Sequence, residues 1–155
     1  MRRSDKEITD KHQIAEILQK AEVIRVAMVD DGEPYIVAMN FAYSGPDNCI
    51  YLHSAAAGRK IDILEKNNRV AFQTEIDAET VLREVACDST ARYRSVCGTG
   101  RICFVRDVEE KRKLLDAIML KYSGRSGFTY SERAIDGTLG MRLEIDSLTG
   151  KKSGY

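Results

Sequence analysis

The sequence lacks an excess of charge of either sign. Of its 155 residues, 24 are Lys or Arg and 24 are Asp or Glu, so the formal net charge is zero. No global field is therefore available to hold a polyanion, and nucleic-acid binding is not expected. Apolar residues make up 43% and charged residues 31%, the usual balance of a globular protein. The length fits one hydrophobic core, so we expect a single domain over residues 1–155.

Long apolar runs and paired cysteine motifs are also missing. No run approaches eighteen residues, so neither a membrane span nor membrane binding is expected. The charged N-terminus leads into no apolar segment and does not resemble a secretory signal. None of the four cysteines forms a CxxC pair, which argues against a disulfide framework or a zinc site. We expect small buried or half-buried thiols and a cytoplasmic location, the cysteines being Cys49, Cys87, Cys97 and Cys103.

Several motifs of common enzyme classes are absent. No GxGxxG follows a strand, no Walker loop is present, and no GxSxG elbow occurs. His12 and His53 are the only histidines and lie far apart in sequence, too few for a His-based metal cluster. These absences argue against a Rossmann dinucleotide site, a P-loop, an α/β-hydrolase and a metal centre.

Alternating apolar patterns between turn signals predict about six strands. They cover residues 23–29, 35–43, 49–53, 69–75, 93–105 and 138–145. A turn is expected at 30–34, because Gly32 can take positive φ and Pro34 is excluded from the inside of a sheet. The first three strands then form a meander. Residues 76–91 are mixed in charge and predict an excursion with a little helix.

Three helices are predicted around these strands, near 11–21, after Gly58 and after Asp107. The first and third begin with an aspartate N-cap and a capping-box partner three residues later, Asp10 with Gln13 and Asp107 with Glu110. The second ends at Asn67-Asn68, expected in the left-handed conformation. Short antiparallel hairpins with peripheral helices predict a mainly β, α+β fold built on a small barrel.

The segment from Ile50 to Lys60 is the most informative part of the chain. A strand runs into a turn of small residues, and the helix that follows begins with Arg59 and Lys60. Free N–H groups at a helix start attract anions, and a guanidinium can grip a phosphate with two hydrogen bonds. The segment is either a phosphate site or a pair of solvated charges. His53 is either a hydrogen-bonded side chain at a strand end or a neutral imidazole beside a cofactor ring.

Two other strands carry polar groups at positions of interest. Asn40 interrupts an apolar strand, and a buried Asn needs partners either from the backbone or from a ligand such as a flavin pyrimidine edge. Tyr93 and Ser95 share one face of their strand, and Arg94 and Val96 share the other. The Tyr93 face is either an ordinary solvated surface or a partner for a phosphate or ribityl chain.

The order and spacing of these segments resemble the pyridoxamine 5'-phosphate oxidase-related flavin-binding proteins over nearly the whole chain. The resemblance is carried by Tyr51-Leu52-His53-Ser54, Gly58-Arg59-Lys60-Ile61-Asp62, Leu64 and Asn68-Arg69-Val70. Three further segments resemble the branch that includes nitroimidazole-resistance proteins. They are Tyr93-Arg94-Ser95-Val96 with Gly98 and Gly100, Ala86-Cys87, and Leu148-Thr149-Gly150-Lys151.

The resemblance implies a six-stranded antiparallel split β-barrel that binds FMN at the interface of a homodimer. Arg59 and Lys60 would bind the FMN phosphate, and His53 would lie near the open flavin face as a proton donor. The other implied cofactor-binding residues are Val37, Met39 and Asn40 along the flavin ring, Ser54 by the phosphate-bearing chain, and Tyr93, Ser95 and Val96 on the neighbouring strand.

The implied activity is that of an FMN-dependent oxidoreductase acting on a small molecule, a nitroimidazole or related nitro-aromatic reduced to its amine. The alternatives are a flavin-binding or storage protein without turnover, a barrel that holds haem or a deazaflavin, and a regulatory domain without a cofactor. The arginine- and histidine-bearing segment that holds substrate in true pyridoxamine-phosphate oxidases has no counterpart, which argues against pyridoxal-phosphate synthesis.

Overall fold

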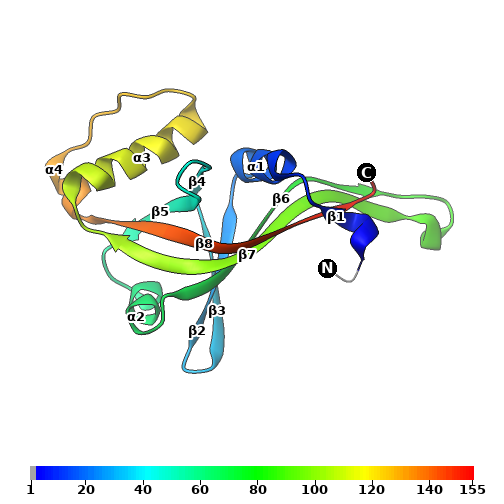
Figure 1. Cartoon of the computed structure of the whole chain (residues 1–155), viewed down its shortest axis with the longest axis horizontal. Helices are drawn as coiled ribbons and strands as arrows, with labels where there is room; N and C mark the ends of the chain where they lie inside the picture. Colours follow the sequence, from blue (N-terminus) through cyan, green and yellow to red (C-terminus); the bar gives the residue numbers. More distant parts are fainter. Residues whose placement is uncertain (1–2) are drawn as a thin grey trace.

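One curved antiparallel sheet organises residues 3–155, the part of the chain that the computed structural model describes (Figure 1). Along the sheet the strands run β3-β2-β6-β7-β8-β5-β4, and β1 pairs with β8. β3 and β4 lie at the two ends of this path, so the barrel is split rather than closed. The strands are β1 (Glu7–Ile8), β2 (Ile24–Asp30), β3 (Glu33–Met39), β4 (Phe41–Ser44), β5 (Cys49–Ala55), β6 (Arg69–Val81), β7 (Thr90–Val105) and β8 (Thr138–Ser153).

The helices lie around this sheet, as Figure 1 shows. They are α1 (Lys11–Lys20), α2 (Arg59–Lys66), α3 (Val108–Ser123) and α4 (Glu132–Asp136), with 3-10 turns at Ser4–Lys6 and Ala86–Asp88. The three predicted helices are present, and α4 adds a short helix that was not predicted. No helix of residues 3–155 is both long enough and apolar enough to cross a membrane. The predicted α+β class is confirmed.

The main core lies where the inward side chains of the sheet meet α1 and α2. Ile17 and Leu18 of α1, Phe41 of β4 and Leu143 of β8 are among its fully buried members. A smaller cluster lies under α3, around Val105. Each fully buried aliphatic or aromatic side chain stabilises the fold by about 1.5–3 kcal/mol relative to exposure.

The predicted strand over 35–43 is two strands, divided at Asn40. β3 pairs with β2 at one end of the sheet, whereas β4 pairs with β5 at the other, so both hairpins of the predicted meander form but its middle strand is broken. Counting β3 and β4 as one interrupted strand and leaving out the two-residue β1 recovers the six expected strands. Pro34 lies in β3 opposite Val29, which is tolerated because β3 is an edge strand that needs no N–H from this residue.

The segment expected as an excursion with a little helix, 76–91, is half strand and carries a 3-10 turn at Ala86–Asp88. β6 continues past a bulge to Val81, and β7 returns from Thr90. Together they form a projecting hairpin, visible at the far right of Figure 1, which we call the arm and define as residues 77–93. The bulge breaks the two-residue alternation of side chains, so the pattern does not reveal the strand.

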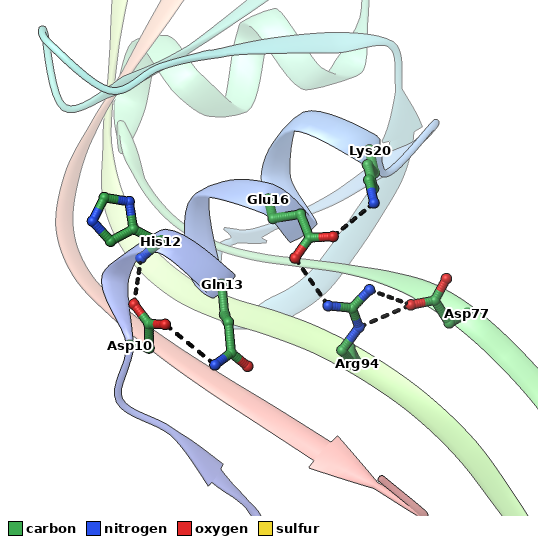
Figure 2. Close-up of polar contacts among 7 residues, drawn as sticks. All are labelled: Asp10, His12, Gln13, Glu16, Lys20, Asp77 and Arg94. Atoms are coloured by element: carbon green, nitrogen blue, oxygen red, sulfur yellow. Dashed lines mark hydrogen bonds and ion pairs between the residues drawn. The ribbon is translucent and has the colours of Figure 1, made fainter.

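Both predicted aspartate N-caps are present, whereas the predicted end of α2 differs. Asp107 accepts a hydrogen bond from the Glu110 N–H. Asp10 accepts from the His12 N–H, and the Gln13 side chain donates to the Asp10 carboxylate (Figure 2). Asn67 has φ of −145°, so α2 ends in extended rather than left-handed backbone.

The cysteine prediction holds in part. All four thiols are free, so no disulfide framework exists. Cys49 is buried and Cys103 half-buried, as expected, but Cys87 and Cys97 are exposed. Cys87 lies in the 3-10 turn of the arm, and Cys97 lies on the outer face of the sheet. Neither position was expected from sequence because exposure depends on the arm and on the sheet face.

Candidate functional site

The junction between β5 and α2 presents an uncapped helix start. Gly58 precedes the helix with φ of 125°, a conformation that favours glycine, and its surroundings are open space. No side chain caps α2. The Gly58 carbonyl accepts from the N–H groups of Ile61 and Asp62. The N–H groups that come before these lie at the positive end of the helix, where an anion is favoured.

The two cations expected to bind phosphate begin this helix but have different surroundings. The Arg59 guanidinium lies 4.6 Å from the centre of the Tyr35 ring and 3.4 Å from the Asp30 carboxylate. These contacts hold it toward the β2–β3 turn, with 58% of its side chain still exposed. Lys60 is half-buried and forms no ion pair with any residue of 3–155. One cation is thus oriented by its neighbours, and the other is free for a ligand.

His53 carries the clearest sign of a missing partner. Its Nδ1 is buried and forms no hydrogen bond within the described chain. An unsatisfied buried polar atom costs about 1–3 kcal/mol, so a partner from outside the chain would be favourable. Burial, and secondly the charge of Lys60, lowers the pKa of His53 below 6.5, so the imidazole is neutral at neutral pH. Ser54 follows it, and its hydroxyl donates to the Ala55 carbonyl at 2.7 Å.

The three candidates on the former strand 35–43 do not share one environment. Val37 is partly buried against the core, and Met39 is a core residue. Asn40 is exposed, so the expected burial of its side chain is wrong. The reason is the break between β3 and β4, which turns this residue outward at the end of the sheet.

The Tyr93 face of β7 lines an open cavity of about 590 Å³, which we call the arm pocket. Tyr93 and Ser95 contribute to it as candidates, and Lys151 of β8 lies across from them with its ammonium 5.4 Å from the Tyr93 ring centre. Val96 is fully buried on the other face, so its side chain does not reach the cavity. The remaining lining residues are Gln73, Glu75, Ala78, Glu79, Thr80, Ala91, Arg92 and Cys97.

A second hollow of about 420 Å³ continues along the same outer face and shares Gln73 and Cys97 with the arm pocket. Its floor is made of small and apolar residues, including Ala27, Ala71 and Gly98. Ile36 stands at its side with 62% of its surface exposed. We call the surface formed by the residues that line this second hollow the outer face.

Six of the ten candidates therefore form two groups on separate parts of the protomer. His53, Ser54, Arg59 and Lys60 gather at the β5–α2 junction, whereas the arm pocket contains only Tyr93 and Ser95 from the candidate set. Sequence reasoning missed Lys151 as a lining residue because the last strand was expected to end at 145. In the structure β8 continues to Ser153, which places Lys151 opposite Ser95. No cluster of three or more metal-binding side chains occurs among the residues described.

The fold is that of the flavin-binding split barrels related to pyridoxamine 5'-phosphate oxidase. The sequence model of the family described as pyridoxamine 5'-phosphate oxidase matches residues 10–152. The chain belongs to this family, as the sequence predicted. A comparison with curated protein sequences found no match.

Solved structures extend this comparison. A candidate 5-nitroimidazole antibiotic resistance protein from Bacteroides thetaiotaomicron is 35% identical, with a TM-score of 0.84 over 94% of this chain and 86% of that one. An FAD and heme binding protein from Mycobacterium smegmatis is 22% identical, with a TM-score of 0.83 over 97% and 74%. A flavocytochrome from Azotobacter vinelandii is 19% identical, with a TM-score of 0.83 over 100% and 72%. The last two show the fold alone, and the first agrees with the predicted branch.

Proposed function

We propose that this protein is an FMN-binding oxidoreductase. The observation that carries the proposal is the uncapped start of α2, which begins with Arg59 and Lys60, together with the buried His53 Nδ1 that has no partner and whose ring feels the charge of Lys60. Backbone N–H groups and two cations suit the FMN phosphate, and His53 suits a polar edge or substrate at the flavin ring. The flavin would supply the redox chemistry, and the protein would supply binding, orientation and electrostatics.

The residue roles follow from this geometry. Arg59, already oriented by Tyr35 and Asp30, would meet the phosphate with a fixed guanidinium, and Lys60 would add a point charge. His53 would take up a second proton on its otherwise neutral ring, pass that proton to the substrate and return to the neutral form. Because burial lowers the pKa of His53, the protonated ring releases this proton readily near neutral pH.

The proposal includes a homodimer. Tyr93 and Ser95 line the arm pocket, which adjoins the outer face and is separate from the β5–α2 junction. A second copy packed against the outer face would bring the two groups together at one cofactor. The small residues of the outer face would allow close approach, and Ile36 would lose its exposure. Each FMN would then be enclosed by two protomers.

The substrate class that we propose is a small nitro-aromatic of the nitroimidazole kind. The support is the 35% identical protein described as a candidate 5-nitroimidazole resistance protein. A flavin-binding protein without turnover is the competing function. Anaerobic reduction of the loaded protein, followed by a nitroimidazole at about one third of the flavin concentration, separates the two. Reoxidation of three two-electron-reduced flavins for each amine formed supports the reductase, and a flavin that stays reduced supports the competitor.

The phosphate site is tested by titrating FMN and riboflavin into matched variants. Arg59→Ala and Lys60→Ala are each expected to raise the Kd for FMN about tenfold or more, since a charge-assisted hydrogen bond contributes about 1.5–3 kcal/mol. The Kd for riboflavin, which has no phosphate, should stay unchanged. Lys113→Ala, at an exposed cation of α3, is the control. Equal losses for FMN and riboflavin would contradict the assignment of the phosphate to these cations.

A further inference from the structure

The arm leaves the barrel at a β-bulge. Ile76 pairs with Arg94 and Glu79 with Arg92, so two residues of β6, Asp77 and Ala78, stand opposite one residue of β7. Asp77 has φ of 55°, a left-handed conformation that few non-glycine residues adopt. A bulge bends a strand and increases its twist, so this one sets the direction in which the arm projects.

Arg94 holds the bulge to the barrel, as Figure 2 shows. Its Nε and Nη2 donate to the Asp77 carboxylate at 2.8 and 2.6 Å, and its Nη1 donates to Glu16 of α1 at 3.0 Å. Lys20 donates to the other oxygen of Glu16 at 2.6 Å. Only 20% of the Arg94 side chain is exposed. One guanidinium thus ties the first helix, the barrel strand β7 and the left-handed residue of the arm together.

The same bulge lies in the middle of the arm pocket. Ala78, Glu79 and Thr80 of β6 and Ala91 to Tyr93 of β7 line the pocket on the arm side. Gln73, Glu75, Ser95, Cys97 and Lys151 line it on the barrel side. A change in the direction of the arm would therefore move one wall of the pocket against the other. Arg94 itself faces away from the pocket, so it acts through the arm rather than on a ligand.

We propose that Arg94 is a positioning residue that sets the shape of the arm pocket by locking the Asp77 bulge to α1. The inference rests on the proposed function, in which Tyr93 and Ser95 of this pocket complete the FMN site. It assigns a role to a side chain that has no access to the cofactor. The arm thereby becomes the element that determines how the flavin and its substrate are enclosed on the Tyr93 side.

The test compares Arg94→Met, Asp77→Gly and the double variant with wild type. Arg94→Met keeps the length of the side chain but removes its donors, and Asp77→Gly keeps the left-handed backbone but removes the carboxylate. Arg101→Met is the control, since Arg101 lies on the same strand with one long contact, 3.9 Å to Asp146. Amide hydrogen exchange reports on the arm. The Kd for FMN and the visible circular dichroism of bound FMN report on the pocket.

We expect amide exchange in 78–81 and 90–93 to accelerate about tenfold in both single variants, with exchange in 100–105 unchanged. In both single variants the Kd for FMN should rise and the dichroism of bound FMN should change. The double variant should show no faster exchange and no higher Kd than Arg94→Met alone, because the two substitutions remove the same interaction. If Arg94→Met fails to fold, Asp77→Gly and Arg94→Lys test the inference in its place. The amide exchange rates and the Kd for FMN of Arg94→Lys should then lie between those of wild type and Asp77→Gly.

Two results would overturn the inference. Unchanged exchange in the arm of the variants would show that Arg94 does not hold it. Faster exchange with an unaltered Kd and dichroism would show that the arm does not shape the pocket. A wild-type protein that takes up no FMN would instead overturn the proposed function and the flavin half of this inference together, and the exchange measurement would still decide whether Arg94 holds the arm.

Discussion

At the scale of single residues, His53 combines burial, a neighbouring cation and an unpartnered nitrogen. Burial and the charge of Lys60 both lower the pKa of His53, so the folded chain resists protonation of this ring. The unfolded chain has no such resistance and binds the proton near the ordinary pKa of 6.5. Stability from this residue is therefore complete above about that pH and decreases as the pH falls below it.

We predict that His53→Gln makes the free energy of unfolding less sensitive to acid. Between pH 7.5 and 5, wild type should lose more stability than the variant, measured from urea denaturation midpoints at several pH values. His12→Gln is the control, because His12 is exposed at the start of α1. A wild type and a His53→Gln variant with parallel pH profiles would contradict the environment described for this residue.

Arg59 and Lys60 show how far single residues can be assigned from sequence. Their place at a helix start follows from the Gly58 turn and the apolar spacing that comes after it, and the structure has the helix begin at Arg59. The contacts of Arg59 with Tyr35 and Asp30 could not be predicted, because they depend on how the β2–β3 turn lies over α2. The burial of Asn40 was predicted wrongly for the same kind of reason.

At the scale of elements, β7 and β8 cross closely at glycines. A Cβ built on Gly100 would lie 2.2 Å from the Glu144 carbonyl oxygen, and one on Gly98 would lie 2.5 Å from the Ser147 carbonyl oxygen. Backbone atoms cannot move aside as a flexible side chain does. The register between the strands shifts at Thr99–Gly100, so the glycines mark the place where the barrel turns.

We predict that Gly100→Ala destabilises the fold by at least about 2 kcal/mol, because it forces backbone apart in a packed sheet. Chemical denaturation of the purified variant measures the loss. Gly45→Ala is the matched control, since its Cβ would lie at an ordinary 3.7 Å from the Tyr43 ring. A Gly100→Ala protein as stable as the control would mean that β7 and β8 do not approach as described.

Element boundaries were predictable where the cause is local. The Asp107 cap and the apolar spacing after it define α3, and the turn at Asp31–Gly32 follows from glycine chemistry. Boundaries set by distant partners were not predictable. The break at Asn40 depends on which strands β3 and β4 pair with, and the arm depends on a bulge whose left-handed residue is Asp77 rather than glycine.

At the scale of the whole molecule, the class of fold follows from the order of hairpins and helices, but the assembly of the site does not. The two groups of candidate residues lie apart within one protomer, and only a second copy in the proposed arrangement would join them. The sequence carries no periodic pattern for that contact, because the outer face is made of small residues scattered over several strands.

We predict that Ile36→Glu converts a dimer into monomers, because it places a charge within the proposed interface. Sedimentation velocity measures the change, and FMN affinity should fall with it, since each site would lose residues from the second copy. Leu120→Glu is the control, an equally drastic change at a half-exposed residue of α3. A variant that remains a dimer and binds FMN as wild type would contradict the proposed interface.

The most direct test of the account is the visible absorption spectrum of the purified protein, with the mass of any compound released on denaturation. We predict the two absorption bands of an oxidised flavin, and FMN as the released compound at about one per protomer. A colourless protein that also fails to take up added FMN, or one that releases haem or a deazaflavin, would contradict it.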